Sequence, residues 1–453
     1  MYRFSLSRSF RTNEKQTLTS AALVLSTLLI FCFIVVLKPS LAPYFSKDTV
    51  IREPIGSKLV HAETDDRINL SCNFTKMSDY CEVRGDVRLN GNNATILSVV
   101  ERESAPESFS LIVRPYSRKF DRSAMAMVRP WKVKVSQSNE KTVSCSVNHT
   151  VPGILFSVGS YARNHFHSFT DILVPLFAAA KPFNGEVRFI ITDNHQYPRW
   201  VPKFQKVLKA LSRYDEIYPD DVANDVVHCF PSVIVGIKHR SHKELSLEMA
   251  GTGCTVADFM VFLRKTYGLK KERAIKVHGA KDRRHPRLLI ISRNKTRTFT
   301  NLGAITTLAE SVGFEVLVDE PGEDLEKAAE MTNGCDVALG VHGAGLTNAM
   351  FLPEKAVLIQ IIPFGFADWV GGNTFRKPAM GMKLRYIEYK IGVDESTLTE
   401  IYPRDDVVFR NPQFFKDQGW VAYRRVYFEQ QNVSVNITRL KPILIRAIDL
   451  LRE

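Results

Sequence analysis

Short apolar runs alternate with segments of helical periodicity through residues 187–363, and this alternation restricts the fold more than any other feature of the chain. The runs that predict buried strands are 187–193, 287–293, 315–318, 336–341 and 356–363. The segments that place apolar residues at helical spacing are 204–211, 302–312 and 324–331. Strands and helices in alternation build parallel sheets with helices on both faces. We therefore predict an α/β fold.

The length of 453 residues exceeds that of one ordinary domain. We expect two Rossmann-like domains, 100–285 and 286–395, that face a cleft. Residues 38–99 are expected to form a stem and a variable region, although short β-like runs begin near residue 67. Residues 396–453 are expected to form a tail whose final helix packs back on the first domain. The apolar face of that helix is made by Leu440, Ile443, Leu444, Ala447, Ile448 and Leu451.

An uncharged apolar run at residues 18–37 predicts a transmembrane helix. At ~1.5 Å per residue it spans roughly 30 Å, the thickness of a bilayer core. Four basic side chains precede it, so residues 1–17 are expected to form a cytoplasmic tail and the rest of the chain to be luminal. These are Arg3, Arg8, Arg11 and Lys15. The alternative is a cleaved signal peptide, but the apolar run is longer than the usual signal core and Pro43 follows the small-residue site.

Glycosylation sequons and cysteines fit a luminal body. Six sequons are predicted to be modified: Asn69, Asn73, Asn93, Asn148, Asn432 and Asn436. A seventh, Asn294, is predicted to stay unmodified because its loop folds into the cleft. Six of the seven cysteines lie outside the apolar run, and no pair has metal-site spacing. Cys72 and Cys81 are the first expected disulfide, and buried free thiols are the alternative.

The formal net charge of +13 favours anionic partners such as nucleotide phosphates or acidic glycans, and general solubility explains it equally well. The basic residues are scattered and the body is expected to be luminal, which argues against nucleic-acid binding.

The sequence VHGAGLTN at residues 341–348 follows a predicted strand and opens a predicted helix. Gly343 and Gly345 let a ligand approach the backbone, and the amides of the next turn favour an anion. His342, Thr347 and Asn348 would add neutral donors to a nucleotide diphosphate. The alternative is a turn that needs glycine for its geometry alone.

Arg293 and Arg297 form a second element just after the strand at 287–293. Open α/β sheets bind ligands at the carboxyl ends of their strands. Two guanidinium groups at this place can fork onto a diphosphate. The alternative is a solvated basic loop.

Three stretches carry a family resemblance. RLLIISRNKTRTFTN (287–301), GCDVALGVHGAGLTNAMFLPEKAVLIQIIPFG (334–365) and ARNHFHSFTDILVPLF (162–177) resemble glycosyltransferase family 61, and the tail with Gly419, Trp420 and Arg439 is similar as well. The resemblance covers most of residues 150–453. It implies a GT-B fold, inversion at the anomeric carbon and a UDP-sugar donor. It is strongest to plant members that add xylose or arabinofuranose to xylan.

The resemblance also implies residue roles. The nucleotide-sugar-binding set is Arg293, Arg297, His342, Gly343, Ala344, Gly345, Thr347 and Asn348. His167 and Asp171 match polar residues of the first-domain motif that face the acceptor. The sequence departs from that motif at His165, where a smaller apolar residue is expected.

Inverting transfer needs a base that takes the proton of the acceptor hydroxyl. We expect Asp171 to be this base, with His167 as its orienter or as the base itself, because a spacing of four residues puts both on one helical face. The alternative is a helix-capping acid beside a hydrogen-bonded histidine. Aromatic candidates for stacking on sugars are Phe166, Trp200, Phe366 and Trp369, although such residues more often belong to a core. No Asp-x-Asp metal site is evident, so neither a metal nor a cofactor is expected.

The combined prediction is a single-pass type II Golgi membrane protein that transfers a pentose from a UDP-sugar to xylan in the lumen. Alternatives are an N-glycan xylosyltransferase, an O-GlcNAc-type transferase, or a non-catalytic glycan-binding scaffold of a wall-synthesis complex. The expected partners are the UDP-sugar and a glycan acceptor, with a homo- or hetero-oligomer left open.

Overall fold

The computed structural model describes residues 69–100, 110–137, 143–220, 226–238, 253–278, 284–320, 322–366 and 372–453. The predicted cytoplasmic tail, the predicted transmembrane helix at 18–37 and most of the predicted stem lie outside these residues. None of the helices in the described ranges has the length and apolar character needed to span a bilayer.

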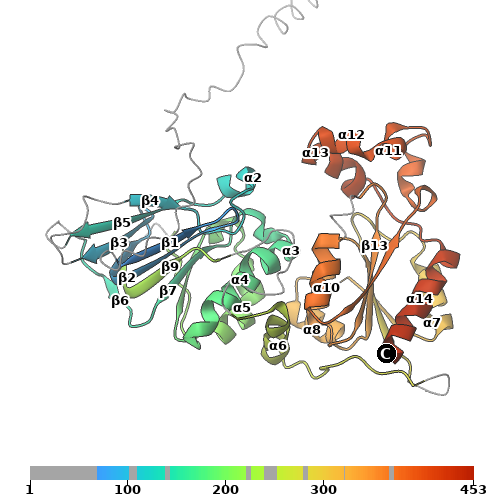
Figure 1. The fold of residues 1–453 in the computed structure, drawn as a ribbon, viewed down its shortest axis with the longest axis horizontal. Coiled ribbons are helices and arrows are strands. Elements are labelled where there is room, and N and C mark those ends of the chain that lie inside the picture. The colour runs from blue at the N-terminus through green and yellow to red at the C-terminus, as the bar shows by residue number, and fades with distance from the viewer. Residues whose placement is uncertain are drawn as a thin grey trace, which may run out of the picture. The chain divides into compact units, whose positions relative to one another are not determined.

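The first sheet, which with its helices we call the first lobe, is a mixed nine-stranded sheet (Figure 1). Its strands are β1 (Leu70–Phe74), β2 (Asp79–Asn90), β3 (Thr95–Val100), β4 (Ser110–Val113), β5 (Trp131–Gln137), β6 (Val147–Asn148), β7 (Gly153–Ser157), β8 (Arg188–Thr192) and β9 (Val227–Val235). The order is β4-β5-β3-β2-β9-β7-β8, with β1 beside β2 and β6 beside β9. Strands β6 to β9 pair in parallel, whereas β2 runs antiparallel to β1, β3 and β9.

The mixed sheet corrects two expectations. The first lobe is parallel and Rossmann-like only around β7 to β9, because beyond β9 the sheet continues in an extension that is antiparallel except between β3 and β5. Residues 70–99 belong to that extension and not to a stem, so the boundary expected at 99/100 falls inside one sheet. Their alternation of buried and half-exposed side chains, as in β3, is typical of a strand with one face on a core.

Two disulfides stabilise this extension. Cys72–Cys81 joins β1 to β2 and confirms the expected pair, and Cys145–Cys229 joins the segment before β6 to β9. The thiols of Cys254 and Cys335 are buried and outside any disulfide.

The helical elements of the first lobe are α2 (Arg122–Ala126), η1 (Ser160–Arg163), α3 (His165–His167), η2 (Ser168–Leu173), α4 (Val174–Ala180), η3 (Lys181–Phe183), η4 (Asn194–Gln196), α5 (Trp200–Leu211) and α6 (Val256–Tyr267). From α3 to α4 the chain is one continuous helical run with a π-helical middle, η2. Asn164 begins it, because its side chain accepts a hydrogen bond from the backbone N–H of Phe166 at 3.0 Å. All six residues of η2 are buried.

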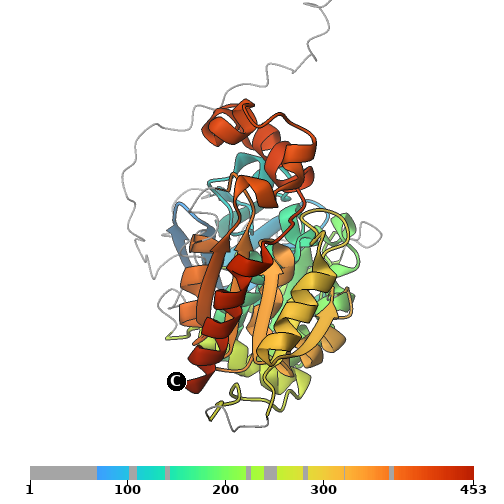
Figure 2. The same cartoon turned by 90° about the vertical axis from the view of Figure 1, so that its right-hand side faces the viewer.

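The second lobe confirms the predicted alternation. Its strands are β10 (Arg287–Ile291), β11 (Glu315–Asp319), β12 (Val337–Val341), β13 (Val357–Ile362) and β14 (Arg385–Lys390). All pair in parallel in the order β11-β10-β12-β13-β14. The helical elements are α7 (Leu302–Val312), α8 (Leu325–Asn333), η5 (Ala344–Phe351), η6 (Gly372–Arg376), α10 (Lys377–Gly381) and α14 (Ile437–Arg452). Helices α7 and α14 cover one face, and α8 and α10 the other (Figures 1 and 2).

The final helix corrects another expectation, because α14 packs on the second lobe and not on the first. It contacts α7, β13 and β14, and Figure 2 shows it beside α7. The residues that it buries are Leu440, Leu444, Ala447 and Leu451, four of the six predicted apolar positions.

The segment before α14 forms a small unit of its own at one end of the second sheet (Figure 1). It contains η7 (Val393–Glu395), η8 (Thr397–Glu400), α11 (Val407–Arg410), α12 (Pro412–Asp417), α13 (Trp420–Arg424) and η9 (Arg425–Glu429). Its buried residues are Leu398, Val408, Tyr423, Val426 and Tyr427. The Tyr423 hydroxyl donates to the carbonyl oxygen of Gly365 at 2.8 Å, so the unit lies at the carboxyl end of β13.

Candidate active site

The loop after β12 lies at the point where the strand order of the second sheet reverses. From β10 the chain crosses to β11 on one side and then returns to β12 on the other. Ligands of open parallel sheets bind at such a switch point, beyond the carboxyl ends of the strands. Arg293 follows β10, and His342 and Gly343 follow β12, so the two predicted elements meet there.

Gly343 lies directly beneath both predicted arginines. A Cβ atom at this position would be 2.6 Å from Nη1 of Arg293 and 3.3 Å from Nη1 of Arg297. The backbone of Gly343 is extended, so glycine is required here by space and not by a special φ angle. Nη1 of Arg297 also donates to the carbonyl oxygen of His342 at 2.7 Å, which fixes it against the loop.

The two guanidinium groups are desolvated, and no carboxylate of the described residues lies in ion-pair contact with either. The charge of Glu320 acts on Arg293 from a greater distance, and Nε of Arg297 is buried without a hydrogen-bond partner among the described residues. Burial lowers the pKa of Arg293, and burial together with the charges of Arg293 and Arg424 lowers the pKa of Arg297 to about 9. Desolvated cations that repel each other are the arrangement expected of an anion-binding site.

His342 is a neutral hydrogen-bond donor in this site. The side-chain amide of Gln360, on β13, donates to Nδ1 of His342 at 2.6 Å, and Tyr386 holds Gln360 by donating to its Oε1 at 2.6 Å. With Nδ1 accepting, the proton of the neutral ring is on Nε2. Burial, with the nearby charges of Arg297 and Arg293, lowers the pKa of His342 to about 3.

The remaining residues of the predicted loop divide between ligand-facing and structural positions. Ala344 and Gly345 are half-buried at the start of η5, and the buried hydroxyl of Thr347 has no partner in the described residues. Asn348 is used internally: its Nδ2 donates to the carbonyl oxygen of Gly345 at 3.0 Å, and its Oδ1 lies 3.1 Å from Nε2 of His165. His165, the departure from the family motif, is therefore a contact between the lobes.

Aromatic side chains surround His342 and Arg297, and they include two of the predicted stacking candidates, Phe166 and Phe366. Phe366 and Phe428 stack with centroids 4.1 Å apart, and the Arg297 guanidinium lies 5.2 Å from the Phe428 centroid. Phe375 lies 5.6 Å from the His342 ring and 5.9 Å from Phe166 of the first lobe. We call Arg293, Arg297, His342 and Gly343 the second-lobe cluster.

Asp171 and His167 do meet, as the spacing predicted. Nδ1 of His167 is 2.9 Å from Oδ2 of Asp171, within the π-helical run. Two residues from the loop between β4 and α2 complete the group: Nε of Arg118 donates to the same oxygen at 2.6 Å, and the Tyr116 hydroxyl donates to it at 3.0 Å. We call Tyr116, Arg118, His167 and Asp171 the first-lobe cluster.

Hydrogen-bond donors of the first-lobe cluster surround the buried carboxylate of Asp171. Its side chain is 3% exposed, against 20% for His167. Burial opposes ionisation, but the charges and hydrogen bonds of His167 and Arg118 outweigh it and hold the pKa of Asp171 well below its ordinary value. Asp171 is not a helix cap, because Asn164 has that role.

His167 keeps one ring nitrogen available. Nε2 has no hydrogen-bond partner among the described residues, whereas Nδ1 lies near both Oδ2 of Asp171 and Nη2 of Arg118, the latter at 3.0 Å. These contacts need opposite tautomers: Nδ1 either donates to Asp171 or accepts from Arg118. Arg118 therefore competes with the tautomer in which Nε2 can accept a proton.

The other predicted sites have mixed outcomes. Trp200 is fully buried and donates to Ser168, so it belongs to the core; Trp369 lies outside the described residues. The sequons Asn69, Asn73, Asn93, Asn148 and Asn436 are exposed. Asn432 is half-buried, with its Oδ1 accepting from the backbone N–H of Thr298 at 3.0 Å. Asn294 is exposed, so burial does not explain the expected lack of modification there.

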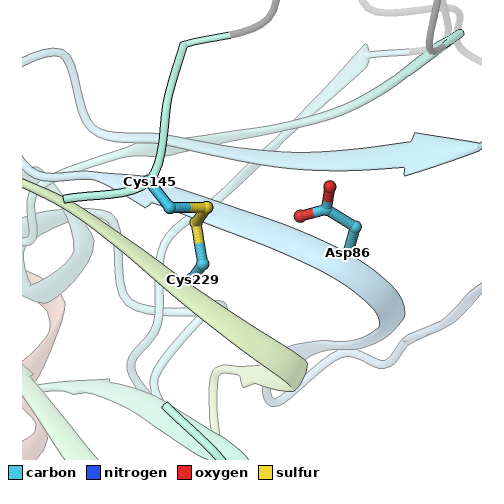
Figure 3. Close-up of side chains that lie close together, drawn as sticks. All are labelled: Asp86, Cys145 and Cys229. Carbon is cyan, nitrogen blue, oxygen red and sulfur yellow. A yellow bond between two sulfur atoms is a disulfide. The ribbon is translucent and has the colours of Figure 1, made fainter. Parts of the chain in front are cut away.

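One group of potential metal ligands is present in the described residues: Asp86, Cys145 and Cys229 (Figure 3). Both sulfurs are in a disulfide, so neither is a thiolate ligand, and Asp86 accepts from Arg88 at 2.6 Å. This group therefore does not fit a metal ion.

Comparison with known proteins connects these clusters to a family. A family model described as Glycosyltransferase 61 matches residues 165–359. The chain is 42% identical over 381 residues to alpha-1,3-arabinosyltransferase XAT3 and 40% identical over 385 residues to alpha-1,3-arabinosyltransferase XAT2, both of Oryza sativa subsp. japonica. These alignments cover 83% and 84% of the chain but only 65% and 64% of the relatives. Beta-1,2-xylosyltransferase XYXT1 of the same organism is 32% identical over 450 residues, 93% of the chain and 94% of the relative.

Proposed function

The chain belongs to glycosyltransferase family 61, and from this premise we propose that it transfers xylose or arabinofuranose from a UDP-sugar to xylan, with inversion at the anomeric carbon. The names of the relatives support the pentose, and the family resemblance supports the xylan acceptor. One observation carries the proposal: two desolvated guanidinium groups without carboxylate partners lie over Gly343 at the switch point of the second sheet.

The second-lobe cluster would bind the diphosphate of the donor. Arg293 and Arg297 would fork onto the phosphate oxygens, and Nε2–H of His342 would donate to a phosphate or the ribose. Negative charge on the diphosphate increases as the C1–O bond breaks, and fixed cations in a desolvated site stabilise that charge. We expect these cations to replace a divalent metal, so that a chelator leaves the rate unchanged.

The first-lobe cluster would activate the acceptor, with His167 as the base. The acceptor oxygen bonds to C1 of the pentose, its proton passes to Nε2 of His167, and UDP leaves with the electrons of the broken bond. Asp171 is better suited to orient His167 than to be the base, because donors from Tyr116, Arg118, Thr170 and His167 stabilise its ionised form and make it a weak proton acceptor. This reverses the first of the two roles expected from the sequence.

The architecture supports a GT-B arrangement, with the donor on the second lobe and the acceptor on the first. The contacts between Phe166 and Phe375 and between His165 and Asn348 link the two clusters through α3. The two disulfides support an oxidising compartment, and with the apolar run at 18–37 we propose a type II protein of the Golgi membrane.

The test is a transfer assay with purified protein, xylo-oligosaccharides and a panel of UDP-xylose, UDP-arabinofuranose, UDP-glucose and UDP-GlcNAc, analysed by mass. The expected product carries one added pentose, and it forms equally with and without EDTA. His167→Ala should abolish transfer while UDP binding, measured by calorimetry, stays within about twofold. Transfer only from UDP-GlcNAc, or UDP binding with no transfer from any donor, would contradict the proposal.

A further inference from the structure

Trp420 is exposed although it belongs to an aromatic cluster. Its side chain is 54% exposed, whereas Trp131 and Trp200 are fully buried. It begins α13 directly after Gly419, whose φ of +100° turns the chain at that point. Tryptophan side chains that stay exposed are enriched at binding interfaces, because the indole offers both an apolar face and an N–H group.

The Trp420 ring continues an aromatic path that starts in the second-lobe cluster. Its centroid is 5.2 Å from that of Phe428, which in turn stacks on Phe366 and lies under the guanidinium of Arg297. A ligand on Trp420 would therefore lie one ring contact beyond Phe428, next to the site proposed for the diphosphate.

Trp420 is the exposed ring of its cluster, because Tyr423 and Tyr427 are buried. The hydroxyl of Tyr423 donates to Gly365 and that of Tyr427 donates to the carbonyl oxygen of Val408 at 2.7 Å, so both are used within the fold. A nucleotide base is recognised through the polar atoms of its edge, which such a surface does not read. A pyranose ring presents a flat face of C–H groups that packs well on an indole.

On these grounds we propose that Trp420, with Phe428 behind it, is an aromatic subsite that binds a sugar ring of the acceptor chain near the transferred pentose. This inference rests on the proposed function for the identity of the chain, which would be a β-linked xylan backbone. Trp420 would act in acceptor binding and would not touch the reacting atoms.

The test compares Trp420→Ala with the matched control Phe414→Ala, which removes another exposed aromatic side chain of the same unit, 45% exposed on α12. Trp420→Ala should weaken xylohexaose binding to the UDP-loaded protein roughly tenfold, the size of one aromatic contact. Trp420→Phe should lose less affinity for xylohexaose than Trp420→Ala does. Phe414→Ala should bind xylohexaose like the unmodified protein, and UDP affinity should be unchanged in all three.

Calorimetric binding keeps the inference separate from catalysis. If no pentose is ever transferred but Trp420→Ala still loses xylohexaose binding, the proposed function fails and the subsite stands. If transfer occurs and Trp420→Ala binds xylohexaose as well as Phe414→Ala does, the subsite is wrong and the function stands. A loss of UDP affinity alone would assign Trp420 to the nucleotide, and a change of oligomer mass alone would assign it to a protein interface; either result overturns the subsite.

Discussion

The first-lobe and second-lobe clusters use the same side chains, arginine and histidine, in opposite electrostatic states. In the first lobe, Arg118 is paired with the buried carboxylate of Asp171 at 2.6 Å. In the second lobe, Arg293 and Arg297 are nearly as enclosed but face each other without a carboxylate. A paired buried cation maintains a geometry, whereas unpaired buried cations gain most when an anion arrives. The charge balance therefore separates a positioning group from a binding group where residue types alone do not.

The largest expected effect is on folding, from Asp171→Ala. Removing this carboxylate leaves Arg118 buried and unpaired, which should reduce the free energy of unfolding by about 3–5 kcal/mol. Denaturant unfolding measures this loss. The matched control is Asp215→Ala, which breaks the exposed pair with Lys209 and should change the free energy of unfolding far less, because water screens that pair. Equal stability of the two variants would remove the distinction between the clusters.

The second effect is on binding, from Arg297→Ala. UDP affinity should fall by about 2–3 kcal/mol, roughly 30- to 150-fold, because a charged hydrogen-bond donor is lost from a desolvated site. The free energy of unfolding should hardly change, since the cation removed has no carboxylate partner. Lys295→Ala, on the exposed part of the same loop, is the control and should bind UDP normally. A loss of stability as large as that of Asp171→Ala would contradict the comparison.

Gly343→Ala should act through Arg293. The new Cβ would lie 2.6 Å from its Nη1, so the guanidinium must move, and UDP affinity should fall about tenfold. Gly303→Ala, where a Cβ meets nothing within 4 Å, is the control. In a protein that already carries Arg293→Ala, Gly343→Ala should reduce the affinity for UDP little further. Full additivity of the two losses would mean that Gly343 has a different role.

Per pH unit, the smallest expected effect is a pH dependence of stability from His342. Its pKa is about 3 in the folded protein and about 6.5 when unfolded, so between these values the unfolded state binds more protons. The contribution is complete above pH 6.5 and is lost as the pH falls, by at most about 1.4 kcal/mol per pH unit. Denaturant unfolding at pH 4 to 7 measures this dependence. The free energy of unfolding should change less steeply with pH in His342→Asn, whose Oδ1 can still accept from Gln360. Identical slopes would show that His342 is not the titrating group.

The sequence predicted the second lobe well because hydrophobic periodicity is local. The four strand runs assigned there form β10 to β13, and Arg293, Arg297 and Gly343 converge because strand order brings loop ends together. Residues contributed from distant segments were missed. Arg118 comes from a loop before α2 and Phe428 from the C-terminal unit, and neither carries a motif. No sequence pattern predicts that unpaired cations lie beside aromatic rings, because the fold alone brings these side chains together.

The errors have a common cause. The sequence predicts short β-like runs from residue 67 without showing that they join the sheet of the first lobe. Amphipathicity shows that the final helix packs without showing on which lobe. The spacing of His167 and Asp171 favours Asp171 as the base, but two donors to its carboxylate, Tyr116 and Arg118, come from a distant loop that carries no motif. Long-range partners thus decide both packing and protonation.

The position of β2 affects how the protein can be produced. This strand pairs with β1, β3 and β9 and so occupies an interior place in the sheet. A recombinant truncation that starts after residue 90, as a conventional stem deletion would, removes β1 and β2 and uncovers the backbone donors and acceptors of β9. Such a fragment should be recovered as aggregate, whereas secretion from a start upstream of residue 69 retains the complete sheet.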